Sequence, residues 1–125
     1  MRLLIDTHVL IWWLSNSSRL SGRARAAIAN QANDLFVSAC VAYEIACKQN
    51  SGRLPPISQQ LPYQLRREGM SVLPISLDHA LAAAVLPGPH RDPWDRVMMA
   101  QAAAEGLTVV TVDHIFAAYG VPVLW

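Results

Sequence analysis

The sequence predicts a three-layer α/β/α fold built around a central parallel sheet of four to five strands. Short apolar runs without polar alternation recur along the chain, as in strands that are buried on both faces. Segments with helical character lie between these runs and are bounded by residues that begin or end helices. Strands that alternate with helices in this way form a parallel sheet covered by helices on both faces.

The predicted elements follow one another in a regular order. The apolar runs predicted as strands are 3–6, 35–38, 71–75, 107–111 and 121–125. Helices are predicted at 9–14, 21–29, 38–50, after the Pro55–Pro56 loop as far as 68, 76–86, 92–105 and 114–119. Side chains that can cap a first turn stand at the helix starts, namely Thr7, Ser21, Ser38, Ser76 and Asp92. Glycine or proline stands at the helix ends, namely Gly52, Gly69, Pro87, Gly106 and Gly120. Pro74 places the third strand at a sheet edge, because proline has no N–H to donate to a neighbouring strand.

Length and composition predict a single domain over residues 1–125. Apolar residues make up 53% of the chain and charged residues only 15%, which excludes a disordered segment. No apolar run reaches the roughly 18 residues that span a bilayer, and Asp6 interrupts the first run, so neither a membrane protein nor a signal peptide is expected. We therefore expect a cytoplasmic protein whose surplus of apolar surface covers a subunit interface.

The cysteines and the net charge give little specific information. Cys40 and Cys47 would lie about 10 Å apart along a helix, too far for a disulfide, so two buried thiols in a reducing compartment are expected. The net charge of +1 provides no overall electrostatic attraction for nucleic acid. The basic residues are nine arginines and one lysine, however, and arginine is the better phosphate ligand.

Four acidic residues stand where this fold would gather them, namely Asp6, Glu44, Asp95 and Asp113. Two of them end apolar runs predicted as strands, and two share a helical stripe with apolar residues. The carboxyl ends of parallel strands meet at one edge of the sheet, where ligands bind. A carboxylate that faces a core is costly unless a cation meets it there, so the pattern points to a metal.

Each acid also has a purely structural interpretation. Asp6 and Asp113 can cap the helices that follow them, and Asp95 can close a capping box with Asp92. Glu44 lies too far into its helix for capping, and its alternative is an i,i+4 ion pair with Lys48.

The joint geometry favours the metal. Carboxylates about 5 Å apart repel by roughly 3 kcal/mol per pair at an effective dielectric constant of about 20. A hard divalent cation offsets several such pairs, and carboxylate ligands favour Mg²⁺ or Mn²⁺ over zinc. A centre of this kind polarises a phosphoryl oxygen and generates a hydroxide nucleophile, which predicts phosphodiester hydrolysis.

Four motifs in order resemble one family over essentially the whole chain. They are LLIDTHVLIWWL, SACVAYEIACKQNSGRL, HRDPWDRVMMAQAAAEGLTVVTVD and the closing AYGVPVLW. The chain resembles the PIN-domain ribonucleases, specifically the VapC-like toxins of bacterial toxin–antitoxin pairs. The departures are mild: Trp94 stands where phenylalanine is common, and Cys47 lies in the helix that carries the second acid.

The resemblance implies a PIN-like fold and an endoribonuclease that depends on Mg²⁺ or Mn²⁺, with the four acids as catalytic metal ligands. It also implies an RNA substrate, a homodimer and an antitoxin partner that occludes the active site. Thr7 and Thr111, beside two of the acids, are expected to orient water or a metal ligand. His8 and His90 are expected to be packing or loop residues, because a metal can supply the base.

Three tryptophans are predicted to serve partner surfaces. Trp12, Trp13 and Trp125 lie near the chain ends on short elements, and tryptophan is enriched in interface hot spots. The alternative is that all of them belong to the core.

Two other functional classes share features of this sequence. A signalling receiver domain would need paired acids after the first strand, an aspartate after the middle strand and a lysine after the last. Asp6 stands alone, Pro74 occupies the end of the third strand and Lys48 is the sole lysine, which excludes this class. A catalytically silent PIN fold that binds RNA or protein remains the alternative, and the presence of all four acids argues against it.

Overall fold

The computed structural model describes residues 1–55 and 59–125, and its centre is a parallel five-stranded sheet. The strand order is β3-β2-β1-β4-β5, and every adjacent pair is parallel. The strands are β1 (Arg2–Ile5), β2 (Asp34–Ser38), β3 (Met70–Leu73), β4 (Thr108–Val110) and β5 (Val123–Leu124). The predicted fold class is therefore confirmed. β3 is an edge strand, as expected, although it ends at Leu73, just before Pro74, and not at Ile75.

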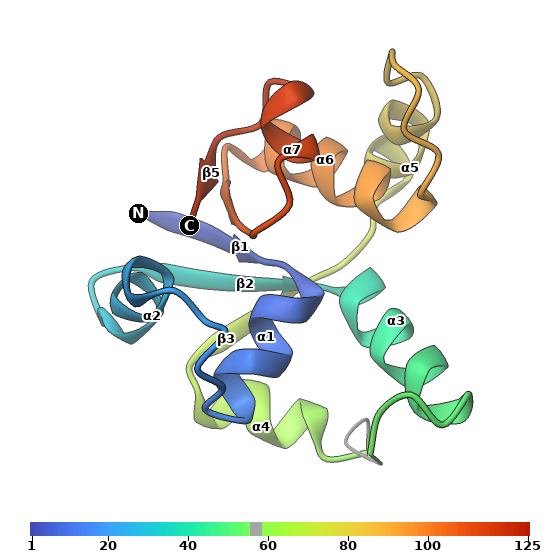
Figure 1. Cartoon of the computed structure of the whole chain (residues 1–125). Coiled ribbons are helices and arrows are strands. Elements are labelled where there is room, and N and C mark those ends of the chain that lie inside the picture. Colours follow the sequence, from blue (N-terminus) through green and yellow to red (C-terminus); the bar gives the residue numbers. More distant parts are fainter. Residues whose placement is uncertain (56–58) are drawn as a thin grey trace.

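The helices cover both faces of this sheet (Figure 1). They are α1 (Thr7–Leu14), α2 (Gly22–Ala29), α3 (Ala39–Asn50), α4 (Leu61–Arg67), α5 (Leu77–Ala84), α6 (Pro93–Glu105) and α7 (Ile115–Ala118). In Figure 1, α1 and α4 lie below the sheet, and α6 and α7 lie above it. This arrangement gives the three layers predicted from the sequence.

The apolar runs of β1 and β4 form the centre of the core. Leu3, Leu4 and Ile5 of β1 are fully buried, because neighbouring strands flank β1 on both sides and helices cover both faces. Met98 and Met99 of α6 are also buried, as the apolar stripe after Asp95 predicted. Burial on both faces explains why these strands show no polar alternation.

Local side-chain signals account for most helix boundaries. Ser21, Ser38 and Ser76 cap α2, α3 and α5 through their hydroxyl oxygens, as predicted. Gly106 ends α6 with φ at 65°, a left-handed conformation that glycine adopts at little cost. The predicted loop residue Pro56 lies outside the described residues.

Two local expectations were wrong. Thr7 does not cap α1: Asp6 is the N-cap, and its carboxylate accepts a hydrogen bond from the Thr7 backbone N–H, so the helix begins at Thr7 and not at Val9. Cys47 is exposed, whereas Cys40 is buried as expected. Helical periodicity places both thiols on related faces of α3, but only the first two turns of that face are covered by the core.

The three tryptophans pack against the core and are each partly buried. The rings of Trp12 and Trp125 lie 5.8 Å apart between centroids, and the Trp13 indole donates to Glu68 Oε2 at 2.9 Å. Their use at a partner surface stays a prediction. No helix in the described parts of the chain is both long and apolar enough to cross a membrane.

Candidate active site at the carboxyl ends of the strands

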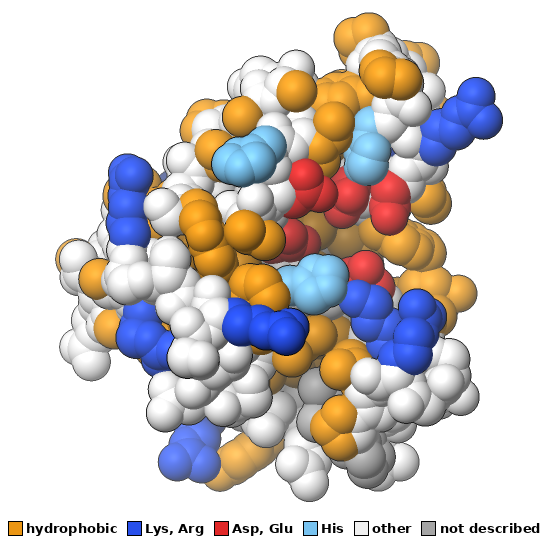
Figure 2. Space-filling model, in the orientation of Figure 1, with side chains coloured by type: hydrophobic (Ala, Val, Ile, Leu, Met, Phe, Trp, Pro, Cys, Tyr) orange, Lys and Arg blue, Asp and Glu red, His pale blue; other side chains and the backbone are white. Residues whose placement is uncertain are grey.

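A cleft of about 410 Å³ brings the four predicted acids together. Its lining consists of Asp6, His8, Glu44, Asp92, Asp95, Val112 and Asp113. Acidic side chains accordingly gather in one hollow of the face drawn in Figure 2, with histidine side chains close by. The carboxyl ends of β1 and β4 supply two of the acids, and helices α3 and α6 supply the others.

Asp6 is the most deeply placed acid of the cleft. It follows β1 directly, and its side chain accepts from the Thr7 N–H at 2.7 Å and from the Thr111 hydroxyl at 2.7 Å. Burial raises the pKa of Asp6, the two hydrogen bonds oppose that rise, and the charge of Glu44 adds to it. Asp6 therefore caps α1, as its structural interpretation expected, and it also lines the cleft, with a separate donor to each carboxylate oxygen.

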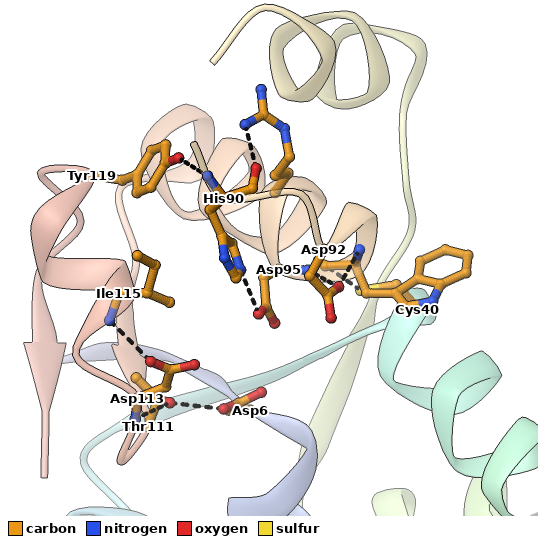
Figure 3. Close-up of polar contacts among 11 residues, drawn as sticks. Asp6, Cys40, His90, Asp92, Asp95, Thr111, Asp113, Ile115 and Tyr119 are labelled. Carbon is orange, nitrogen blue, oxygen red and sulfur yellow. Dashed lines mark hydrogen bonds and ion pairs between the residues drawn. The ribbon is translucent and has the colours of Figure 1, made fainter. Parts of the chain in front are cut away.

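Thr111 connects two of the acids. Its hydroxyl donates to Asp6 Oδ2 and accepts from the Asp113 N–H at 3.0 Å (Figure 3). Asp113 itself is exposed and accepts from the Ile115 N–H at 3.0 Å through Oδ1. Asp113 is not the N-cap of α7, because that position belongs to His114, but one of its oxygens accepts from the first residue of this helix and the other is available to the cleft. Thr7 contributes its backbone N–H to the site.

Asp95 contacts a histidine that was expected to be a packing or loop residue. The His90 Nε2 atom lies 2.9 Å from Asp95 Oδ2, and each side chain is 23% exposed. The carboxylate therefore does not close a capping box with Asp92. Burial raises the pKa of Asp95 to about 6, His90 opposes the rise by hydrogen bonding, and the charges of Asp92 and Asp6 add to it.

Glu44 forms the i,i+4 ion pair with Lys48 that its structural interpretation expected, and it also lines the cleft. Its Oε1 atom lies 3.8 Å from Lys48 Nζ across one turn of α3. The same ammonium group lies 3.5 Å from Nε2 of His8, which also lines the cleft. Because an ammonium only donates, His8 accepts in this contact. His8 and Lys48 thus form a basic rim next to Glu44.

Asp92 is a cleft residue that sequence reasoning had assigned only to capping. Its Oδ1 atom accepts from the N–H groups of Trp94 and Asp95, at 2.9 and 3.2 Å, which confirms it as the N-cap of α6. It also lines the cleft, and its charge raises the pKa of Asp95. The spacing of Asp92 and Asp95 within one turn was the available signal for this proximity.

The carboxylates that line the cleft are spaced apart from one another. Within residues 1–55 and 59–125, no three His, Cys, Asp or Glu side chains are grouped so that they could hold one metal ion. The four acids therefore line one cleft without forming a closed set of ligands, and their joint role in metal binding stays a prediction. The negative charges of the carboxylates repel one another. Two of the acids also contact basic side chains, since Lys48 lies next to Glu44 and His90 lies next to Asp95.

The donor set of the cleft still fits a hard cation. Its lining offers carboxylate oxygens from Asp6, Glu44, Asp92, Asp95 and Asp113, the ligand type that Mg²⁺ and Mn²⁺ prefer. Among the described residues, Lys48 is the one lysine or arginine that forms an ion pair with any of these acids. Most of the negative charge thus remains uncompensated within the chain, as a metal site requires.

A second cavity, of about 440 Å³, lies at the amino ends of β2 and β3. Its lining includes Trp13, Asn30, Arg67 and Glu68. Its acid is bonded to the Trp13 indole, and none of the acids of the first cleft reaches it. The chemistry therefore points to the acid-lined cleft, although the other cavity is slightly larger.

The fold and this acid-lined cleft together define a class of protein. The family model of the PIN domain matches residues 3–122, and the chain belongs to the PIN-domain family. It is 34% identical over 117 residues to Ribonuclease VapC22 of Mycobacterium tuberculosis, covering 89% of this chain and 86% of that protein.

Solved structures share the fold along nearly the whole chain. The structure of VapBC2 from Rickettsia felis bound to a promoter DNA fragment matches with a TM-score of 0.73 and 16% identity, over 99% of this chain and 98% of that one. A toxin–antitoxin complex from Klebsiella pneumoniae matches with a TM-score of 0.64 and 23% identity, over 98% of this chain and 96% of that one.

Proposed function

We propose that this chain is a ribonuclease toxin of a toxin–antitoxin pair, and that it hydrolyses RNA phosphodiester bonds with Mg²⁺ or Mn²⁺ bound by Asp6, Glu44, Asp95 and Asp113. The observation that carries the proposal is the convergence of these acids, from four separate segments, on one cleft. The relative named Ribonuclease VapC22 supports RNA as the substrate.

The divalent cation would supply the polarisation of a phosphoryl oxygen and a hydroxide nucleophile at neutral pH. The residues of the chain prepare for it in distinct ways. Thr111 and the Thr7 N–H hold Asp6 in one orientation, and Thr111 also holds the start of the Asp113 segment. Lys48 would release Glu44 to the cation, because the pair is long, at 3.8 Å, and an i,i+4 ion pair on a helix contributes only a few tenths of a kcal/mol.

The proposed partners follow from the comparisons and from the surface. The matched structure from Klebsiella pneumoniae is a toxin–antitoxin complex, which supports an antitoxin partner for this chain. We propose that this partner covers the cleft. Leu77 and Leu81 of α5, and Val85 at its C-cap, are exposed at 75%, 60% and 79% and stand at successive i,i+4 positions. An apolar stripe of this kind on a small domain supports a homodimer that uses α5. RNA as substrate and two free cysteines support a cytoplasmic location.

The test is cleavage of RNA by the purified chain. We expect cleavage with Mg²⁺ or Mn²⁺, none with EDTA, and none with Asp6→Asn. The variant should remain folded, because the amide no longer bears a charge that burial disfavours. Expression of the wild-type chain alone should stop bacterial growth, and expression of Asp6→Asn should not. An Asp6→Asn protein that cleaves at the wild-type rate would contradict the proposal.

The alternative is a catalytically silent PIN fold that binds RNA or protein. Calorimetry with Mn²⁺ separates the two, since a silent module should bind RNA without binding the cation. Mapping the RNA ends that appear on induction would then identify the cleaved sequence.

A further inference from the structure

His90 lies on the loop between α5 and α6 and is held there from two directions. Its backbone N–H donates to the Tyr119 hydroxyl at 2.9 Å, and its carbonyl oxygen accepts from Arg96 Nη1 at 3.0 Å. The two rings also meet edge to face, with centroids 6.3 Å apart. Figure 3 shows Tyr119 above His90 and Asp95 below it. The position of the imidazole is therefore set by two residues outside its own loop, one in α6 and one just after α7.

Arg96 and Tyr119, which hold this loop, make further contacts with it. Arg96 also donates to the carbonyl oxygens of Ala83 at 3.2 Å and Leu86 at 2.5 Å, so its guanidinium binds backbone and not the nearby carboxylates. Gly88 lets the Tyr119 hydroxyl approach, since a Cβ atom at that position would lie 2.5 Å from Oη. The loop is thus shaped around the tyrosine hydroxyl and the arginine.

In this position the imidazole of His90 contacts the carboxylate of Asp95 in the cleft. Nε2 lies 2.9 Å from Asp95 Oδ2. An ionised carboxylate only accepts, so Nε2 carries the hydrogen of this bond. The contact leaves Oδ1 of Asp95 as the oxygen available for a cation.

We propose that His90 is a positioning residue for Asp95, anchored by Tyr119 and Arg96 so that its imidazole keeps one oxygen of the carboxylate directed for cation binding. This inference deepens the proposed function and rests on it. The terminal torsion of an aspartate is broad, so an unheld carboxylate samples many orientations. Asp6 and Asp92 also line the cleft, and their repulsion would turn a free Asp95 away from it. The hydrogen bond from His90 opposes that rotation.

The expected size of the effect follows from other metal sites. Hydrogen-bond partners of metal-ligating groups change metal affinity or activity by about 10- to 100-fold when they are removed. Glutamine at this position should restore most of the lost metal affinity, because its neutral amide has a similar reach and the proposed role is to donate one hydrogen bond. Loss of Tyr119 Oη should have a smaller effect, because it loosens the loop but leaves the imidazole in place.

The experiment measures Mn²⁺ affinity by calorimetry and RNA cleavage at subsaturating Mn²⁺, for wild type, His90→Ala, His90→Gln and Tyr119→Phe. We expect about 10- to 100-fold weaker Mn²⁺ binding for His90→Ala, near wild-type binding for His90→Gln and a several-fold loss for Tyr119→Phe. The matched control is His114→Ala, which removes an exposed histidine next to Asp113 and should change neither readout. Melting temperatures without metal show whether each variant is folded.

The outcomes separate this inference from the function on which it rests. A wild-type protein that neither binds Mn²⁺ nor cleaves RNA overturns both. A wild type that does both, together with a His90→Ala protein of unchanged Mn²⁺ affinity, overturns the role of His90 alone. A His90→Gln protein as weak as His90→Ala overturns it as well, since the loss would then not depend on a hydrogen-bond donor. If His90→Ala does not fold, an unchanged Mn²⁺ affinity in Tyr119→Phe decides against the anchored loop.

Discussion

Thr111 donates a hydrogen bond of 2.7 Å to Asp6, a residue 105 positions earlier in the chain. The bond joins the ends of the paired strands β1 and β4, and both of its partners are buried. Because the same hydroxyl accepts from the Asp113 N–H, one threonine fixes the relative positions of two acids.

Replacing Thr111 by valine tests this relationship. The substitution keeps the shape and leaves Asp6 Oδ2 and the Asp113 N–H without their partner. An unsatisfied buried polar group costs about 1–3 kcal/mol, so the free energy of unfolding should fall by that amount in urea titrations without metal. Thr108→Val, at the other end of β4, is the control and should cost much less. Equal losses at both positions would show that the bond has no special role.

Metal binding should raise the melting temperature through the acids of the cleft. Binding to the native state alone stabilises by about 2.7 kcal/mol at a hundredfold excess over Kd, which is several degrees for a domain of this size. Glu44→Gln should remove much of the shift caused by Mn²⁺. Asp92→Asn should retain it, because asparagine caps α6 about as well. The reverse result would show that Asp92, which also lines the cleft, is a ligand and Glu44 is not.

The stability of the metal-free protein should depend on the protonation of Asp95. Burial raises its pKa from 3.8 to about 6, so the folded state holds this proton more tightly than the unfolded state. The resulting stability is fully present below about pH 4 and is lost as the pH rises to about 6, a change of roughly 3 kcal/mol at most.

Asp95→Asn should flatten this part of the pH profile, and Asp34→Asn, at an exposed position, should not. The stabilisation by Mn²⁺ should change in the opposite direction and grow from pH 5 to pH 7, because the cation needs the ionised carboxylate. Thermal unfolding at several pH values measures both effects. A metal-free profile that is identical for Asp95→Asn and wild type would contradict the assignment.

The two cysteines should differ in reactivity. Cys47 is exposed, whereas Cys40 is buried and burial raises its pKa to about 11. Iodoacetamide at about pH 8 should therefore label only Cys47 in the native protein, because the thiolate is the reactive form. Mass spectrometry after digestion identifies the labelled residue, and Cys47→Ser should leave the native protein unlabelled. Modification of Cys40 before unfolding would show that α3 is less tightly packed than described.

The exposed stripe of α5 should mediate self-association. Leu81→Glu places a charge in the middle of the stripe and should convert a dimer to a monomer in light scattering at micromolar concentration. Tyr63→Glu changes an equally exposed side chain on α4, at 61% against 60%, and should leave the dimer intact. A wild-type protein that is already monomeric would exclude the dimer itself.

Local sequence was sufficient for the architecture. The central strands β1 and β4 are buried on both faces, so their apolar composition marks them, and short polar caps mark most of the helices. The order of elements then places the strand ends at one edge, which made Asp6 and Asp113 recognisable as candidates. Glu44 was recognisable because no helix-capping role explains an acid in the middle of α3.

The contacts among these side chains were decided only by the tertiary structure. His90 meets Asp95 because Tyr119, 29 residues later, and Arg96 shape the loop between α5 and α6. Helical periodicity located the face that carries Cys40 and Cys47, but which turns of that face are covered depends on the elements packed against it. Asp92 reaches the cleft as well as its helix because α6 begins beside the other acids. A sequence pattern specifies which residues share a face or a strand end, whereas distances between remote side chains depend on how the loops and helices pack.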